Sequence, residues 1–322
     1  MNSQAQEFSL SAAVFGLGKI GLQYDLGINN QILPGRTLTH CKAISDSIRF
    51  HLEYTFDPDT DRCKLSNEIY NVKAFSKLET LLLEPPPDLL VVAAPTDSHR
   101  SLIEQILSIW QPRMLILEKP LGVAVADAKQ IANLLANTNI VTFVNYSRRF
   151  LPNFRAIHNS NAFHARGNLL SVNVHAYGTL LNIYSHFLDL VIYLESRDLI
   201  GSHSIEIEAR NACSFKFKDL DTLISYAFNG FETEGVDCSM ELKYENLTLR
   251  MTQNGKLIVL ENSGGVVLES YECPDGDFRH YQATVLAQML VDAETQPSFD
   301  QIHDAISIHE FIEAIESANA RY

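Results

Sequence analysis

The sequence predicts two domains that mix helices with strands. The first is an α/β domain with a doubly wound parallel sheet, because apolar strands alternate with helical segments over about the first 145 residues. The second is an α+β domain with a large, mostly antiparallel sheet, because seven short strand-like runs lie between residues 205 and 269. The 322 residues fit two domains of roughly 150 residues each, which we place at 1–148 and 149–322.

The composition limits the classes of partner. Lys and Arg number 25 against 39 Asp and Glu, and the resulting net charge of −14 repels a polyanion, so we expect no nucleic acid partner. The longest apolar runs are interrupted or too short to cross a bilayer, so we expect no membrane association. Five scattered cysteines without a C-x-x-C pair are typical of free thiols in a reducing, cytoplasmic compartment. No His and Cys spacing predicts a metal site.

The first apolar run, Ala12–Phe15, ends in glycines spaced G-x-G-x-x-G. Glycine allows a sharp turn and close approach to a ligand, and the amides that start the following helix face a negatively charged group. The usual ligand of this motif is a dinucleotide pyrophosphate. By itself the motif is also compatible with an ordinary strand-to-helix turn. Together with the rest of the chain it predicts a dinucleotide-binding Rossmann domain in residues 1–148, with cofactor contacts from Gly16, Gly18, Lys19, Ile20 and Gly21.

A loop-like insertion follows the glycines and leads to a predicted helix, Thr39–Ile48, and an alternating strand, Phe50–Phe56. Asp57 closes this strand, where a carboxylate accepts hydrogen bonds from the ribose hydroxyls and repels a 2′-phosphate. We therefore expect NAD as the cofactor, with NADP as the alternative because Arg62 is close. Considered alone, Asp57 is equally explained as a turn residue before Pro58. Asp57 stands 36 positions beyond Gly21, against the usual distance of about 20, and the insertion accounts for the excess.

The rest of the first domain continues the alternation of helix and strand. A buried strand that ends at a proline places the next loop at the carboxyl edge of a parallel sheet, where ligands bind. Two such loops are expected, after Ala94 and after Leu117. The predicted elements are helix Phe75–Leu83, strand Asp88–Ala94, helix His99–Leu107, strand Met114–Leu117, helix Val125–Leu135 and strand Ile140–Val144.

Five motifs together resemble the Gfo/Idh/MocA family of nicotinamide-dependent sugar and inositol oxidoreductases. They are Gly16–Gly21, Asp57–Asp59, Ala94–Thr96 with His99, Glu118–Pro120 and Asn145–Phe150. The resemblance covers essentially the whole chain. It implies further cofactor contacts from Asp57, Ala94, Pro95, Thr96, His99, Glu118 and Lys119.

The resemblance also implies that Lys119, in the motif Glu-Lys-Pro, lies beside the nicotinamide and is catalytic. A hydroxyl that gives up hydride from its carbon must also lose a proton, so a base within hydrogen-bond reach is needed. Partial burial and a neighbouring positive charge both favour the neutral amine that can act as this base. The alternative is a surface lysine paired with Glu118. Pro120 is compatible with either a cis or a trans peptide bond.

In the second domain the resemblance assigns proton transfer to His186, and the alternative is a histidine at a helix start that is hydrogen-bonded within its own domain. Many dehydrogenases of the family carry an Asp four residues before this histidine, but here the position is Asn182. An amide orients a hydroxyl or an imidazole and cannot accept a proton. Two interpretations stay open: Lys119 and His186 carry the chemistry while Asn182 binds substrate, or the dehydrogenase reaction has been altered or lost.

Three further residues lie near these motifs. Arg148 and Arg149 follow the last strand of the first domain, where the resemblance implies an arginine near substrate or cofactor, and we select Arg148 as substrate-binding. The alternative is a basic pair on an interdomain turn. Asp189 shares a helical face with Asn182 and His186 if the helix begins early enough, and we expect it to brace the site or cap a neighbour rather than touch substrate.

The remainder is rich in predicted strands and ends in two predicted helices. One face of the antiparallel sheet is left for subunit association, so we expect a homodimer or homotetramer. The strands are Leu169–His175, Ile205–Arg210, Cys213–Phe217, Thr222–Phe228, Val236–Tyr244, Leu247–Met251, Lys256–Leu260 and Val266–Glu269, and the closing helices are Tyr281–Val291 and Gln301–Ser317.

The sequence thus favours an NAD(P)-dependent oxidoreductase that acts on a hydroxyl or keto carbon of a small-molecule substrate, namely a sugar, a nucleotide sugar or a polyol. A second hypothesis is a dinucleotide-binding sensor or regulator without turnover, which the amide of Asn182 favours. A third is reduction of an imine or a tetrapyrrole-like substrate.

Overall fold

The computed structural model describes residues 9–195, 204–209, 212–216, 223–229, 238–273, 280–295 and 301–319. The chain forms two compact units, residues 1–145 with 279–303 and residues 146–278 with 304–322. From the sequence, residues 279–303 were expected in the second domain. This segment groups with the first because helix α10 (Tyr281–Thr295) contacts helix α1 (His40–Ser45).

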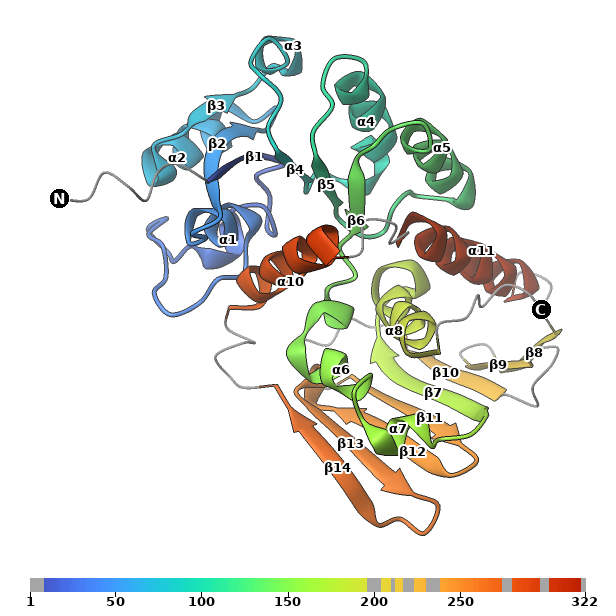
Figure 1. Ribbon diagram of the computed structural model, residues 1–322. Coiled ribbons are helices and arrows are strands. Elements are labelled where there is room, and N and C mark those ends of the chain that lie inside the picture. Colours follow the sequence, from blue (N-terminus) through green and yellow to red (C-terminus); the bar gives the residue numbers. More distant parts are fainter. Residues whose placement is uncertain are drawn as a thin grey trace. The chain divides into compact units, whose positions relative to one another are not determined.

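The first unit contains the predicted doubly wound parallel sheet, which has six strands in the order β3-β2-β1-β4-β5-β6 (Figure 1). The order reverses between β1 and β4, and ligands of such sheets bind in the crevice outside the carboxyl ends of the strands at this point. The strands are β1 Leu10–Phe15, β2 Phe50–Phe56, β3 Lys73–Phe75, β4 Leu89–Val92, β5 Met114–Leu117 and β6 Val141–Val144.

Every residue of β4 and of β5 is buried, as expected of parallel strands covered on both faces by helices. The prediction of strand β2 and of helices α4 and α5 is confirmed to the residue. Besides α1 and α10, the helices of this unit are α2 Thr60–Tyr70, α3 Leu78–Leu81, α4 His99–Leu107 and α5 Val125–Leu135.

Helix α2 and strand β3 were not predicted, and their composition explains why. Of the eleven residues in α2 only Cys63 and Ser66 are buried, so the helix carries no apolar stripe. Its ends are set locally, since the Asp59 side chain accepts hydrogen bonds from the backbone N–H groups of Asp61 and Arg62, and Asn71 ends it with a φ of 52°. Strand β3 has three residues, too few for a visible alternation.

The second unit contains an eight-stranded sheet in the order β14-β13-β12-β11-β7-β10-β9-β8. Only β7 and β10 pair in parallel, so the predicted mostly antiparallel sheet is confirmed. The strands are β7 Leu169–Tyr177, β8 Ser204–Ala209, β9 Ala212–Lys216, β10 Leu223–Asn229, β11 Ser239–Tyr244, β12 Leu247–Thr252, β13 Leu257–Asn262 and β14 Val267–Glu272. The predicted strand ends at Arg210, Phe217, Thr222 and Val236 lie outside the described residues.

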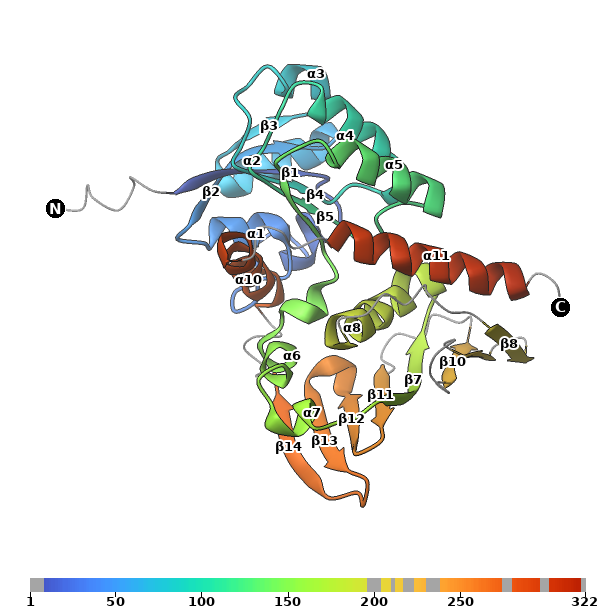
Figure 2. The same ribbon diagram turned by 45° about the vertical axis from the view of Figure 1, so that its right-hand side comes forward.

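Alternation along β11 and β12 gives this sheet one apolar face. Leu242 and Leu249 are completely buried, whereas Lys243 and Arg250 on the opposite face are exposed. Helix α8 lies beside β7 and β10 in both views (Figures 1 and 2). The helical segments here are α6 Pro152–Ile157, α7 Asn161–His164, a π-helical turn at Leu180–Tyr184, α8 Ser185–Glu195 and the part of α11 (Gln301–Asn319) that follows His303.

None of the helices in the described part of the chain combines the length and apolarity that a bilayer crossing requires. Cys41, Cys63, Cys238 and Cys273 are free thiols.

Candidate functional site

The glycine motif forms the turn that leaves strand β1. Gly16 has a φ of +95°, and a β-carbon there would lie 2.5 Å from the backbone of Ala93 and Ala94. A β-carbon on Gly21 would lie 1.9 Å from the carbonyl oxygen of Gly16. At Gly18 a β-carbon would meet nothing within 4 Å. Gly16 and Gly21 therefore close the turn against its own backbone, whereas Gly18 faces open space.

Four consecutive backbone amides in this turn have no acceptor in the described structure. The N–H groups of Gly18, Lys19, Ile20 and Gly21 donate no hydrogen bond, whereas the N–H groups on either side are used: Leu17 donates to Asp57, and Leu22 donates to the carbonyl of Gly18. Unpaired amides at the start of a helical turn form a site for an anion. Their arrangement beside Gly18 fits the pyrophosphate of a dinucleotide.

Asp57 lies at the end of β2, as predicted, and its carboxylate is buried against the glycine turn. Its Oδ2 accepts from the backbone N–H of Leu17 at 2.8 Å, and its Oδ1 accepts from that of Asp59 at 2.9 Å. The guanidinium of Arg62 lies 3.3 Å from Oδ2 and 3.5 Å from the Asp59 carboxylate. Asp57 thus holds the turn in place, and the half-exposed Arg62 adds a positive charge beside it.

The helix that should follow the glycines is interrupted by the predicted insertion. The backbone N–H groups of Leu22 and Gln23 still bond to the carbonyl of Gly18, and that of Tyr24 bonds to the carbonyl of Lys19. The partners of the next two carbonyls come from much later in the chain. The N–H of His40 bonds to the carbonyl of Ile20 at 3.1 Å, and that of Cys41 to the carbonyl of Gly21 at 3.1 Å. Helix α1 therefore stacks on the helical turn that follows the glycines, and the residues between this turn and α1 form an inserted loop.

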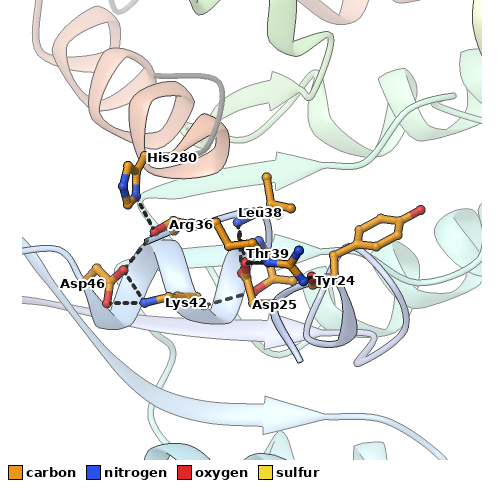
Figure 3. Close-up of polar contacts among 9 residues, drawn as sticks. Tyr24, Asp25, Arg36, Leu38, Thr39, Lys42, Asp46 and His280 are labelled. Carbon is orange, nitrogen blue, oxygen red and sulfur yellow. Dashed lines mark hydrogen bonds and ion pairs between the residues drawn. The ribbon is translucent and has the colours of Figure 1, made fainter. Parts of the chain in front are cut away.

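The return of the insertion depends on one buried carboxylate (Figure 3). Asp25 is completely buried and accepts hydrogen bonds from the backbone N–H groups of Leu38 and Thr39 and from the Thr39 hydroxyl, at 2.7 to 3.0 Å. Arg36 lies 3.8 Å from the same carboxylate and bonds to the carbonyl of Tyr24. Buried bonds of this kind give the insertion a fixed path, so that α1 begins at a defined residue.

At the carboxyl ends of β5 and β6 the structure brings together Glu118, His40 and Asn145, with Lys119 as the next residue. The Nε2 of His40 lies 2.7 Å from Glu118 Oε1, and the Asn145 amide donates to the same oxygen at 2.6 Å. Burial raises the pKa of Glu118, but the bonds from His40 and Asn145 and the charge of Lys119 outweigh it and hold that pKa below its usual value. Glu118 was predicted as a cofactor contact, and its observed contacts are these.

Lys119 is partly exposed and precedes a cis peptide bond to Pro120. The partners of Glu118 were not predicted. For His40 the available signal was a histidine at the start of the helix that follows the insertion, and for Asn145 it was an amide that directly follows the last parallel strand.

The loop after β4 contains Ala94, Pro95 and Thr96, all at least partly exposed, with His99 behind them. The His99 ring is completely buried, with Nε2 3.0 Å from the carbonyl oxygen of Ala94 and Nδ1 3.2 Å from that of Leu121. His99 was predicted to contact the cofactor. The structure instead places its ring between the loops after β4 and β5, so its observed contacts are with the protein itself.

In the second unit, Asn182 and His186 lie on either side of a change in helix type. Asn182 belongs to the π-helical turn, where its N–H bonds to the hydroxyl of Thr179, and it is exposed. His186 is in the first turn of α8, partly exposed, with its ring edge-on to Tyr146 at 5.8 Å. Asp189 is completely buried, so the three residues expected to share one polar face do not share one environment.

Asp189, which was expected to brace the site or cap a neighbour, pairs with Arg149. The guanidinium of Arg149 is buried and bonds to both carboxylate oxygens of Asp189 and, at 2.9 Å, to Asp304 on α11. Burial raises the pKa of Asp189 to about 7. Arg148 is partly exposed, with its guanidinium 5.1 Å from the ring centre of Phe187. Of the two arginines, Arg149 is therefore held in the interior by ion pairs, whereas Arg148 is partly exposed.

Lys119 belongs to the first unit and His186 to the second, and their meeting over one substrate stays a prediction. Within the described ranges no three His, Cys, Asp or Glu side chains come together as a metal site.

A family model described as an oxidoreductase family with an NAD-binding Rossmann fold, GFO_IDH_MocA, matches residues 10–146. The chain is 26% identical to myo-inositol 2-dehydrogenase of Thermotoga maritima over 145 residues. This match covers 45% of this chain and 38% of that enzyme. It is 24% identical to oxidoreductase cns1 of Cordyceps militaris over 58% of this chain, but covers only 27% of that protein. The chain therefore spans well under half the length of these two curated relatives.

A longer match, at 19% identity, covers 97% of the chain and 87% of scyllo-inositol 2-dehydrogenase (NAD(+)) of Bacillus subtilis. Among solved structures, the WlbA dehydrogenase of Bordetella pertussis in complex with NADH and UDP-GlcNAcA has a TM-score of 0.70 at 15% identity, over 98% of this chain and 96% of that one. A super-repressor mutant of Gal80p from Saccharomyces cerevisiae has a TM-score of 0.75 at 14% identity, over 97% and 96%. These structural matches establish the fold.

Proposed function

Because the N-terminal domain of this chain belongs to the Gfo/Idh/MocA family of NAD-binding oxidoreductases, we propose that the protein is an NAD(P)-dependent dehydrogenase or reductase. Its substrate is a sugar, a nucleotide sugar or a polyol, reacting at a hydroxyl or keto carbon. The observation that carries the proposal is the row of four unpaired amides at residues 18–21, at the sheet edge that also presents Lys119.

The cofactor supplies the hydride acceptor or donor when it is bound. The amides of the glycine turn bind its pyrophosphate, and the open space beside Gly18 allows the backbone to approach closely. Asp57 fixes the turn and stands where the ribose hydroxyls are recognised. Asn145 contributes a buried amide oxygen that accepts no hydrogen bond from the described residues, and an amide N–H donor of a ligand would satisfy it.

Lys119 moves the proton. In the direction of oxidation its neutral amine accepts the hydroxyl proton as hydride leaves the carbon, and in the direction of reduction its ammonium returns a proton to the carbonyl oxygen. His186 from the second unit assists at the same oxygen. The proposal assigns Asn182, which is exposed and ends in an amide, to hydrogen bonding with substrate hydroxyls. Arg148 supplies a charge for a phosphate or carboxylate of the substrate.

Replacing Lys119 with Met tests the proposal. Removing the base should lower kcat by about a hundredfold or more, while the Kd for NAD, measured by titration calorimetry, changes less than about threefold. Turnover is followed as NADH absorbance with a panel of sugars, nucleotide sugars and inositols. Lys129→Met, at an exposed position on α5, is the matched control and should retain full activity. Full activity in Lys119→Met would remove this lysine from the mechanism.

A second candidate is a dinucleotide-binding regulator without turnover. It is favoured by the amide at Asn182, which cannot take up a proton, and the fold of Gal80p is compatible with it. NAD that binds tightly, together with absent turnover across the whole panel in both directions, would favour this candidate over the dehydrogenase. An imine substrate is distinguished by turnover in the reducing direction only.

A further inference from the structure

Three side chains from distant parts of the chain form a closed polar cluster immediately before Lys119. His40 at the start of α1 and Asn145 at the end of β6 both reach Glu118 Oε1, at 2.7 and 2.6 Å. The exposed fraction of these residues is 5% for His40, 9% for Glu118 and 2% for Asn145. A buried carboxylate with two short hydrogen bonds to a single oxygen has a defined position.

The insertion determines which residue supplies the imidazole. In an uninterrupted helix the carbonyl of Ile20 would accept from residue 24, but here it accepts from His40. Residue 24 is Tyr24, whose backbone N–H bonds instead to the carbonyl of Lys19 at 2.9 Å. His40 therefore occupies the helical position that faces the end of β5, and the buried bonds of Asp25 keep it there.

The Glu118 side chain retains its negative charge. Burial acts to protonate Glu118, but its hydrogen bonds and its charged neighbours oppose this and lower its pKa. The titratable groups whose charges lower the pKa of Glu118 are His40 from α1 and Lys119, the next residue in the chain, and Asn145 from β6 is uncharged. Glu118 is thus a carboxylate at neutral pH, next to the lysine that the proposed function uses as acid and base.

We propose that His40 is a positioning residue that holds the Glu118 carboxylate, and that this carboxylate sets the proton affinity of Lys119. The inference rests on the proposed function. An adjacent negative charge stabilises the ammonium form of Lys119, which opposes the effect of a cationic nicotinamide. In the direction of reduction this keeps a proton on the amine, and the lysine can act in both directions near neutral pH.

The test measures the titration of Lys119 directly, so it does not depend on finding a substrate. In protein labelled with [ε-¹³C]lysine, the Lys119 signal is assigned by its loss in Lys119→Met, and its midpoint is followed by NMR. Glu118→Gln keeps an oxygen that can accept both hydrogen bonds and removes only the charge. We expect this variant to lower the midpoint by about one pH unit.

The control is Glu84→Gln, which removes a carboxylate of the same unit that pairs with Lys73 at 2.9 Å, and it should leave the Lys119 midpoint unchanged. His40→Leu removes one donor to Glu118 and should produce part of the shift. His40→Gln places an amide N–H near the former Nε2 and should restore the original midpoint. If circular dichroism shows that Glu118→Gln does not fold, the comparison of His40→Leu with His40→Gln still tests the proposal.

An unchanged midpoint in Glu118→Gln would overturn the role of the carboxylate. Equal midpoints in His40→Gln and His40→Leu would overturn the positioning role of His40. Failure of the wild-type protein to turn over any substrate, with the expected NMR shifts still present, would count against the proposed function alone.

Discussion

Replacing each of the three glycines of the first turn with Ala should affect stability at two positions and cofactor binding at the third. At Gly21 the new β-carbon would lie 1.9 Å from the Gly16 carbonyl oxygen. At Gly16 it would lie 2.5 Å from the backbone of Ala93 and Ala94, which follow β4, and the backbone φ of Gly16 is +95°. At Gly18 neither obstacle exists. The same chemical change is therefore expected to have opposite consequences within six residues.

The magnitudes follow from these contacts. A backbone collision that cannot relax costs about 3 kcal/mol in Gly21→Ala. Gly16→Ala adds about 1–2 kcal/mol of left-handed strain to a similar collision. Gly18→Ala should leave the free energy of unfolding within about 1 kcal/mol of the wild-type value. A small increase in stability is expected, because Ala reduces the conformational entropy of the unfolded chain. Its methyl group occupies the space that the pyrophosphate needs, so the Kd for NAD should rise about tenfold.

Thermal unfolding and titration calorimetry with NAD measure the two effects. Gly21→Ala and Gly16→Ala should lower Tm by about 6 °C or more, whereas Gly18→Ala should keep the wild-type Tm and lose affinity. Wild-type affinity for NAD in Gly18→Ala would refute the assignment of this turn to the pyrophosphate. A Tm of Gly18→Ala as low as that of Gly21→Ala would refute the reasoning from the glycine contacts.

Three other perturbations have defined outcomes. Asp25→Ala leaves the N–H groups of Leu38 and Thr39 without their acceptor and should lower the free energy of unfolding by about 2–4 kcal/mol, with faster hydrogen exchange across residues 26–39; unchanged exchange would contradict the role given to Asp25. Arg62→Ser should weaken NADP binding about tenfold and NAD binding less than about threefold, and equal losses in calorimetry would exclude a role in discrimination. Burial raises the pKa of Asp189 from 3.8 to about 7, so its stabilising contribution is complete below pH 3.8 and is lost as the pH rises through about 7. In Asp189→Asn, the free energy of unfolding measured by urea denaturation between about pH 5 and 8 should lack this loss with rising pH. A pH dependence of the free energy of unfolding identical to that of the wild type would refute this prediction.

The first unit was predicted well because its signals are local. An apolar strand such as β4 and an amphipathic helix such as α4 each show their own periodicity, and a parallel sheet follows from their alternation. The carboxyl ends of β1, β4 and β5 then lie at one edge, so the glycine turn and Lys119 could be assigned to that edge before the fold was known. The polar helix α2 has no such periodicity, so only the three-dimensional structure showed that these residues form a helix.

The roles of individual side chains depended on distance in space. Arg148 and Arg149 are adjacent and chemically identical, yet only Arg149 meets Asp189, forty positions later, and is used for packing. The π-helical turn before α8 moved Asn182 out of phase with Asp189, which a count of residues along an ideal helix could not anticipate.

By itself the sequence determined the doubly wound sheet, the mostly antiparallel second sheet and the edge at which a dinucleotide is expected, because these follow from periodicity and glycine positions within short windows. Only the tertiary structure decided that the insertion delivers His40 to Glu118, 78 positions away, and that α10 returns to the first unit. The physical reason is that such pairings are set by the path of the chain and by buried hydrogen bonds like those of Asp25, which leave no repeating pattern along the sequence.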